Sequence, residues 1–330
     1  MSTIRRSPRR AGGYRARVRD EQRDGRPTLL VLRALQIGDL LVAVPALRAL
    51  RHAFPDHRLV LATTGMLAPI VDRIGGVDLL LPTPDPPVVP WTGPAPDVAV
   101  NLHGTGPQSH RALDALGPIR RIGFRCADAG WDGPDRDVVA AAHPHERERW
   151  CALLQDAGIA ADPGDLHLDA ERGTRPWPVL VHPGAAFGSK RWPVERFAAV
   201  AAALDGPVVI TGSAAERDLA TAVARAAGLP DERVLAGRTD LGELCDLVAG
   251  AALVVSGDTG IAHLASAYGT PSVVLFGPVD PAQWGPPPGP HVALARPAHR
   301  RGARFADDPD PALLAIGVDE VLAAAASVRR

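Results

Sequence analysis

The sequence is poor in cysteine and lacks any long apolar run, and both absences exclude classes of protein. Its three cysteines, Cys126, Cys151 and Cys245, lie far apart and form neither a CxxC pair nor the Cys/His spacing of a zinc site. We therefore expect reduced thiols, no metal site and a cytoplasmic protein. No apolar run approaches the roughly 18–20 residues that a membrane-spanning helix requires.

Neither sign of charge predominates. The chain has 36 basic and 37 acidic residues and a formal net charge of -1, which gives no general attraction to nucleic acid. The signatures GxGxxG and GxxxxGK[ST] are missing from any suitable context, which argues against a dehydrogenase or a P-loop enzyme. At 330 residues the chain has room for two domains of about 150 residues each.

The N-terminus is strongly basic. Residues 1–19 include seven arginines and no acid, and no apolar segment follows at once, so this is not a secretory signal. We interpret residues 1–27 as a disordered, solvated tail. The alternative is a polybasic patch that touches anionic lipid, which would make the protein peripheral at the inner face of a membrane.

Short apolar segments alternate with helical patterns in both halves. Strands are expected at 28–32, 58–62, 77–81, 98–102 and 119–124, with a helix at 40–53. After a linker near 170–178, strands at 179–181, 208–211, 234–235, 253–255 and 272–276 alternate with helices, and a final helix covers 317–327. This alternation predicts an α/β protein with two Rossmann-like parallel-sheet domains, residues 28–172 and 173–330, that face a central cleft. The last helix could pack on either domain, including back on the N-terminal one.

The segment VVSGDTGIAHL, residues 254–264, places a polar turn between a buried strand and a helix. A helix that begins at the carboxyl edge of a parallel sheet offers free N–H groups and a positive dipole end to an anion. Gly257 and Gly260 would let the anion approach, Thr259 adds a hydroxyl, and His263 follows one turn later. The alternative is that Asp258 or Thr259 is only an N-cap.

Two further strand–turn–helix junctions have the same character. The first, HPGAAFGSKRWP, carries Ser189 and Lys190, which is the only lysine in the chain and could neutralise a phosphate. The second, ITGSAAERD, contains Thr211 and Gly212. A solvated surface lysine is the simpler interpretation of Lys190, but three such junctions on one sheet edge favour an anion site.

The corresponding junction of the N-terminal half, LQIGDLLVAVPALRAL, carries a carboxylate instead, that of Asp39. On this motif alone a helix N-cap is the favoured interpretation. If the two halves face each other, Asp39 would project into the cleft opposite a phosphate site, where it could take a proton from a hydroxyl.

In order and spacing, these motifs resemble glycosyltransferase family 9, the heptosyltransferases, over about residues 28–285 and the last helix. The resemblance implies a GT-B fold with an N-terminal acceptor domain and a C-terminal nucleotide-sugar domain. It implies Asp39 as general base, Lys190 as the diphosphate-binding lysine and Ser189 beside it as a donor-binding residue. It also implies Asp258, Thr259, Gly260 and His263 as the donor loop, Thr211 and Gly212 near the nucleotide, and Glu243 as the acid that binds the ribose.

The implied activity is metal-independent, inverting transfer of a sugar, heptose from ADP-heptose above all, to a hydroxyl of a glycan or glycolipid in cell-envelope biosynthesis. The nucleotide sugar is a co-substrate, and no cofactor is expected. A GT-B nucleotide-sugar epimerase and a non-catalytic nucleotide-sugar-binding protein are the alternatives. The segment RPAHRRGARFADDPDPALL lacks the cysteine cluster that many relatives carry before the last helix.

Overall fold

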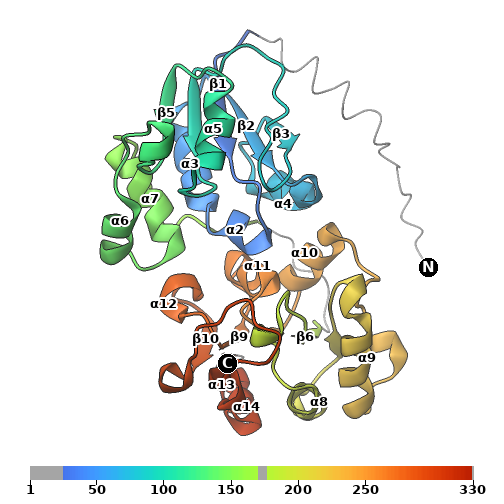
Figure 1. The fold of residues 1–330 in the computed structure, drawn as a ribbon. Coiled ribbons are helices and arrows are strands. Elements are labelled where there is room, and N and C mark those ends of the chain that lie inside the picture. The colour runs from blue at the N-terminus through green and yellow to red at the C-terminus, as the bar shows by residue number, and fades with distance from the viewer. Residues whose placement is uncertain (1–24, 170–176, 329–330) are drawn as a thin grey trace, which may run out of the picture.

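Two parallel β-sheets, one in each half of the chain, form the framework of the protein (Figure 1). The structure is a computed structural model and describes residues 25–169 and 177–328. Most of the predicted basic tail and most of the predicted linker lie outside these residues, and the contact of the tail with lipid stays a prediction. None of the helices in the described ranges is long and apolar enough to cross a bilayer.

The N-terminal sheet has the strand order β3-β2-β1-β4-β5. Its strands are β1 Thr28–Leu32, β2 Arg58–Thr63, β3 Leu79–Pro82, β4 Val98–Asn101 and β5 Arg120–Ile122. Its helices are α2 Ile37–Leu41, α3 Val44–Ala53, α4 Ala68–Ile74, α5 Pro107–Asp114, α6 Arg136–Ala142 and α7 Glu146–Asp156. β1 and β2 are buried along their whole length, as the central strands of a parallel sheet covered by helices must be.

The helix expected over 40–53 is two helices, which corrects the prediction. α2 begins earlier, at Ile37, and ends at Leu41, and α3 begins at Val44. Pro45 explains the break, because it has no N–H to donate to the carbonyl of Leu41 one turn earlier. Pro45 instead occupies the first turn of α3, where an N–H would have no partner within the helix.

The C-terminal sheet has the order β10-β9-β8-β6-β7. Its strands are β6 Val179–His182, β7 Val208–Ile210, β8 Leu253–Gly257, β9 Ser272–Phe276 and β10 His291–Ala295. Its helices are α8 Val194–Ala203, α9 Arg217–Ala226, α10 Leu241–Ala249, α11 Gly260–Tyr268, α12 Pro281–Trp284, α13 Pro311–Leu314 and α14 Val318–Val328.

Three features of this half differ from the predictions or decide between them. The strand expected at 234–235 is a single bridge between Ile210 and Val234. β10 was not predicted, although residues 292–295 are apolar; it is a half-exposed strand at the edge of the sheet. The last helix, α14, packs against α8, β9 and β10 of its own half and not back on the N-terminal half (Figure 1).

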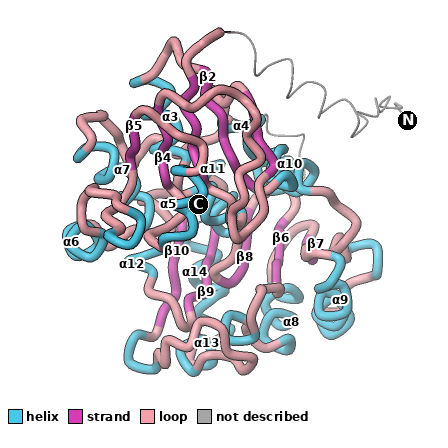
Figure 2. Tube along the Cα trace, turned by 45° about the horizontal axis from the view of Figure 1, so that its top comes forward, coloured by secondary structure: helices cyan, strands magenta, loops and turns pink. Residues whose placement is uncertain are grey.

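The two halves meet where α2 packs against α11 and α4 against α10. Figure 1 shows α11 and α10 between the strands of the two sheets, and Figure 2 gives the same elements in a view turned by 45°. One buried apolar cluster includes Leu40 and Leu41 of α2 together with Ile261 and Leu264 of α11, so a single core joins the halves. The carboxyl edges of both sheets are therefore held close together.

Two glycines make this approach possible. A Cβ at Gly38 would lie 2.6 Å from Cδ2 of His263, and a Cβ at Gly260 would lie 2.9 Å from Cβ of Ile37. Non-bonded carbon atoms do not approach each other this closely, so a side chain at either glycine would force His263 or Ile37 to move. From the sequence, Gly260 is expected to let an anion approach, whereas in the structure the space beside Gly260 is filled by the side chain of Ile37.

Replacing Gly38 with alanine should separate α2 from α11, because the ring of His263 is packed in and cannot easily move aside. Overpacking of this kind typically costs about 1–3 kcal/mol of unfolding free energy. We expect a lower melting temperature for Gly38→Ala. Gly317→Ala is the matched control, since a Cβ there meets no atom within 4 Å. Equal melting temperatures for the two variants would contradict the close contact.

Candidate active site

Asp39 lies in the first turn of α2, directly after β1, at the carboxyl edge of the N-terminal sheet. It is the third residue of the helix and not its N-cap. Its Oδ2 accepts a hydrogen bond from the backbone N–H of Gln36 at 3.2 Å, so the carboxylate does help to close the helix end. Its side chain is nevertheless 27% exposed and can still be reached by a substrate.

Lys190 and Asp258 form an ion pair at the carboxyl edge of the C-terminal sheet. Lys190 ends a short 3₁₀ turn, Gly188–Lys190, and its Nζ donates to Oδ2 of Asp258 at 2.7 Å. Asp258 follows β8, and its side chain is only 7% exposed. A carboxylate this buried needs a cationic partner, which Lys190 supplies. The geometry therefore excludes the interpretation of Lys190 as a freely solvated lysine.

Ser189 anchors the turn that carries Lys190. Its hydroxyl donates to the carbonyl of Arg304 at 2.7 Å, its N–H to the carbonyl of Ala306 at 2.9 Å, and its carbonyl accepts from the N–H of Asp310 at 3.1 Å. The residue is 1% exposed. The segment 304–310 thus holds the lysine turn in place, and the hydroxyl of Ser189 already has a partner.

His263 connects the two parts of the site. Its ring lies against Gly38, the neighbour of Asp39, and its Nε2 is 3.9 Å from Oδ1 of Asp258. Trp284 meets the ring edge-on, with centroids 5.8 Å apart. Burial lowers the pKa of His263, while the charges of Asp258 and Asp39 oppose that shift. The structure brings Asp39, His263, Asp258 and Lys190 into one cluster drawn from both halves.

Thr259 occupies the N-cap position of α11, but its side chain makes no capping hydrogen bond. Its Oγ1 is buried and has no hydrogen-bond partner among the described residues. Since Asp258 pairs with Lys190, neither side chain acts as the helix cap that the alternative interpretation required. The hydroxyl of Thr259 is thus a buried polar atom left without a hydrogen-bond partner at the start of α11, which is a costly arrangement.

Thr211 and Gly212 lie at the end of β7, beside two polar residues that the sequence analysis missed. Oγ1 of Thr211 is 3.0 Å from Nδ1 of His182, and a Cβ at Gly184 would lie 2.3 Å from Cδ of Glu216. Burial would raise the pKa of Glu216, but hydrogen bonds from Ser213 and the charge of His182 lower it. Glu216 is therefore an ionised acid at this sheet edge. The signal was present in GSAAE, a capping box that follows a strand.

Glu243 has a different position. It is exposed and is the third residue of α10, where its Oε2 accepts from the backbone N–H of Asp240 at 2.9 Å. Its role in the described contacts is that of a capping acid. Its assignment as the ribose-binding residue stays a prediction, and Glu216 is a second candidate for that role.

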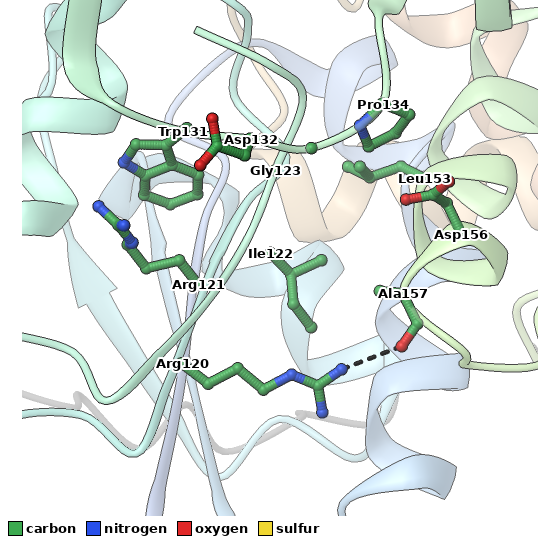
Figure 3. Close-up of a pocket in the computed structure, with 11 residues that line it drawn as sticks. Arg120, Arg121, Ile122, Gly123, Trp131, Asp132, Pro134, Leu153, Asp156 and Ala157 are labelled. Carbon is green, nitrogen blue, oxygen red and sulfur yellow. Dashed lines mark hydrogen bonds between the residues drawn. The ribbon is translucent and has the colours of Figure 1, made fainter. Parts of the chain in front are cut away.

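A cavity of about 340 Å³ lies elsewhere, on the flank of the N-terminal half beside β5 and α7 (Figure 3). Arg120, Arg121, Trp131 and Asp156 are among the residues that line it, and none of the candidate site residues does. Arg120 donates to the carbonyl of Ala157 at 3.0 Å across its edge. Within the described ranges, no group of three or more His, Cys, Asp or Glu residues is arranged to hold a metal ion.

The protein has two parallel-sheet halves, and an acid and a lysine–aspartate pair lie close to each other at their facing edges. This arrangement is that of a GT-B glycosyltransferase. The model of glycosyltransferase family 9 (heptosyltransferase) matches residues 114–300, and the chain belongs to this family.

Similar proteins agree with this assignment. Lipopolysaccharide heptosyltransferase 2 of Escherichia coli K12 is 27% identical over 295 residues, which cover 77% of this chain and 83% of the relative. Lipooligosaccharide heptosyltransferase 2 of Haemophilus influenzae is 39% identical over 114 residues, so the match spans only 32% of each chain. The solved structure of the E. coli ADP-heptose lipopolysaccharide heptosyltransferase II superposes with a TM-score of 0.73 at 21% identity, covering 92% of this chain and 98% of that one.

Proposed function

We propose that this glycosyltransferase moves heptose from ADP-heptose to a hydroxyl of a lipopolysaccharide core sugar, with inversion at the anomeric carbon and without a metal ion or other cofactor. The observation that carries the proposal is the contact of His263 with Gly38 on one side and its approach to Asp258 on the other. A base on one half and a phosphate-binding cation on the other are thereby close enough to act on one substrate. The name of the E. coli structural relative supports ADP-heptose as the donor.

The chemistry follows from this placement. The oxygen of the acceptor hydroxyl attacks the anomeric carbon from the face opposite the diphosphate, and its proton passes to the carboxylate of Asp39. The bond between the anomeric carbon and the phosphate oxygen breaks, and its electron pair leaves with ADP. The ammonium of Lys190 and the N–H groups at the start of α11 stabilise the charge that develops on the diphosphate.

The deciding experiment is incubation of the full chain with ADP-heptose and lipopolysaccharide core fragments truncated before and after each heptose. We expect release of ADP with one fragment, a product of inverted anomeric configuration by NMR, and an unchanged rate in EDTA. Release of an isomerised nucleotide sugar without acceptor would establish the epimerase instead. Donor binding without turnover on any fragment would favour the non-catalytic alternative.

We further propose that Glu216, and not Glu243, binds the ribose hydroxyls. Glu216 lies beside Gly184 at the carboxyl edge of the sheet, where the charge of Arg191 next to Lys190 reaches it, whereas Glu243 is exposed at the start of α10. Both acids close a capping box, and glutamine can do so too, which makes the two Glu→Gln variants a matched pair.

Glu216→Gln should weaken ADP binding about tenfold, since a hydrogen bond to a charged group contributes roughly 1.5–3 kcal/mol. Glu243→Gln should leave the affinity unchanged. Isothermal titration calorimetry with ADP distinguishes the two, and the reverse order of effects would restore Glu243 as the ribose ligand.

A further inference from the structure

A buried arginine lies directly behind Asp39. Arg33 follows β1, and its side chain is 2% exposed. Its Nε donates to the main-chain carbonyl of Asp39 at 2.8 Å, and its Nη1 donates to the carbonyl of Leu102. Its Nη2 lies 3.6 Å from Oδ1 of Asp39. One guanidinium therefore contacts both the backbone and the carboxylate of the residue assigned as base.

The arginine is itself held rigidly. Its guanidinium lies over the ring of Trp150, with Cζ 4.7 Å from the ring centroid, and its backbone carbonyl accepts from the hydroxyl of Thr63 at 2.7 Å. Burial lowers the pKa of Arg33 to about 10, with Asp39 and Glu146 opposing the shift, so the side chain is protonated at neutral pH. A buried guanidinium that is fixed from several sides has little freedom to adopt another arrangement.

The two carboxylate oxygens of Asp39 have different surroundings as a result. Oδ2 faces the N–H of Gln36 and Oδ1 faces Arg33. A general base works only within hydrogen-bond reach of the proton that it removes, so its orientation controls the rate. The described contacts of Arg33 all lie within the N-terminal half, away from Lys190 and Asp258.

We propose that Arg33 is the positioning residue of the transfer reaction: it fixes the backbone and carboxylate of Asp39 and does not contact the donor. The inference rests on the proposed function, because it takes Asp39 to be the base. A positioning residue changes the rate of the chemical step and leaves donor binding intact. This difference distinguishes the proposed role of Arg33 from that of an arginine that only stabilises the fold.

The test uses Arg33→Met, Arg33→Lys and the control Arg58→Met. Arg58 is also 2% exposed but lies at the amino end of β2, at the opposite edge of the same sheet. We expect Arg33→Met to lower kcat by about 10- to 100-fold, the range that a small misplacement of a reacting group can cost. The KM for ADP-heptose and the affinity for ADP should stay unchanged. Arg33→Lys should recover part of kcat, because it keeps the charge but not the paired hydrogen bonds.

Arg58→Met measures the cost of losing a buried arginine, and we expect it to lower the melting temperature without lowering kcat of the folded fraction. In an Asp39→Asn background, Arg33→Met should cause no further loss of rate. If Arg33→Met does not fold, Arg33→Lys carries the test through its lowered kcat at unchanged ADP affinity.

Full kcat in Arg33→Lys and in a folded Arg33→Met, or rate losses that add to those of Asp39→Asn, would overturn the inference. A failure of the proposed function has a different signature, namely wild-type protein that transfers no heptose or Asp39→Asn that transfers it at the normal rate.

Discussion

Asp39→Asn should reduce the rate of heptose transfer by about 10³-fold, within the range that a positioned general base contributes. Asparagine has nearly the same shape and can still accept the hydrogen bond from Gln36, so the start of α2 should be preserved. What it lacks is the basic oxygen that removes the proton of the acceptor hydroxyl. ADP affinity, measured by calorimetry, should change little, because Asp39 belongs to the half opposite Lys190. The rate is measured from ADP release in the presence of acceptor.

The control for this variant is Asp135→Asn. Asp135 is an acid at a helix end, the N-cap of α6, where its carboxylate accepts from two backbone N–H groups. It reports the effect of removing a capping charge from a helix other than α2, and it should keep the wild-type rate. An Asp39→Asn enzyme that turns over as fast as Asp135→Asn would remove Asp39 from the mechanism.

Lys190→Met should have two effects of different origin. It removes the cation proposed to neutralise the diphosphate, so we expect ADP affinity to fall by about 10²-fold, as for the loss of a charge-assisted contact. It also leaves the buried carboxylate of Asp258 without its partner, and loss of one member of a buried pair typically costs about 3–5 kcal/mol. Because the side chain of Lys190 is 24% exposed, the loss of unfolding free energy should fall below that range.

A double variant separates the two effects. Lys190→Met with Asp258→Asn removes both charges, so the melting temperature should recover toward the wild-type value while ADP binding stays weak. Lys190→Arg keeps the charge and should retain part of both properties. Recovery of ADP binding in the double variant would contradict the role of Lys190 in holding the diphosphate.

The Lys190–Asp258 pair also bears on the order of events in the site. The lysine that the proposed reaction needs for the donor is already bonded to Asp258 at 2.7 Å. A diphosphate must share or replace that contact, so part of its attraction to Lys190 is offset by the carboxylate. The same pairing fixes the lysine side chain before the donor binds. Binding therefore costs less conformational entropy than it would with a free lysine side chain.

Much of the framework could be predicted from the local pattern of residues. Runs such as Leu29–Leu32 and Leu253–Val255 are apolar over several residues, which is typical of buried parallel strands. β10 and the break at Val42–Ala43 were less predictable. β10 is a half-exposed edge strand that directly follows GPPPGP, a run typical of a loop, and the break depends on how Pro45 is used.

The candidate site divides in the same way. Asp39, Lys190 and Asp258 could be selected from sequence because each follows a strand, and the ends of parallel strands share one edge. The parts played by Ser189, Glu216 and Arg33 could not. Their partners, Arg304 for Ser189, Gly184 for Glu216 and Leu102 for Arg33, come from other strands or segments, and no local pattern specifies such pairs.

The sequence alone therefore determined the α/β class, the two-sheet organisation and the family, because these depend on periodicity, turn residues and the order of short motifs. Only the tertiary structure decided that His263 lies between Gly38 and Asp258, that Lys190 is paired, and that Arg33 lies behind Asp39. The physical reason is that these relations join residues from separate elements of the fold. Their distances are set by the packing of whole elements, above all of α2 against α11, and not by the local preferences of any segment.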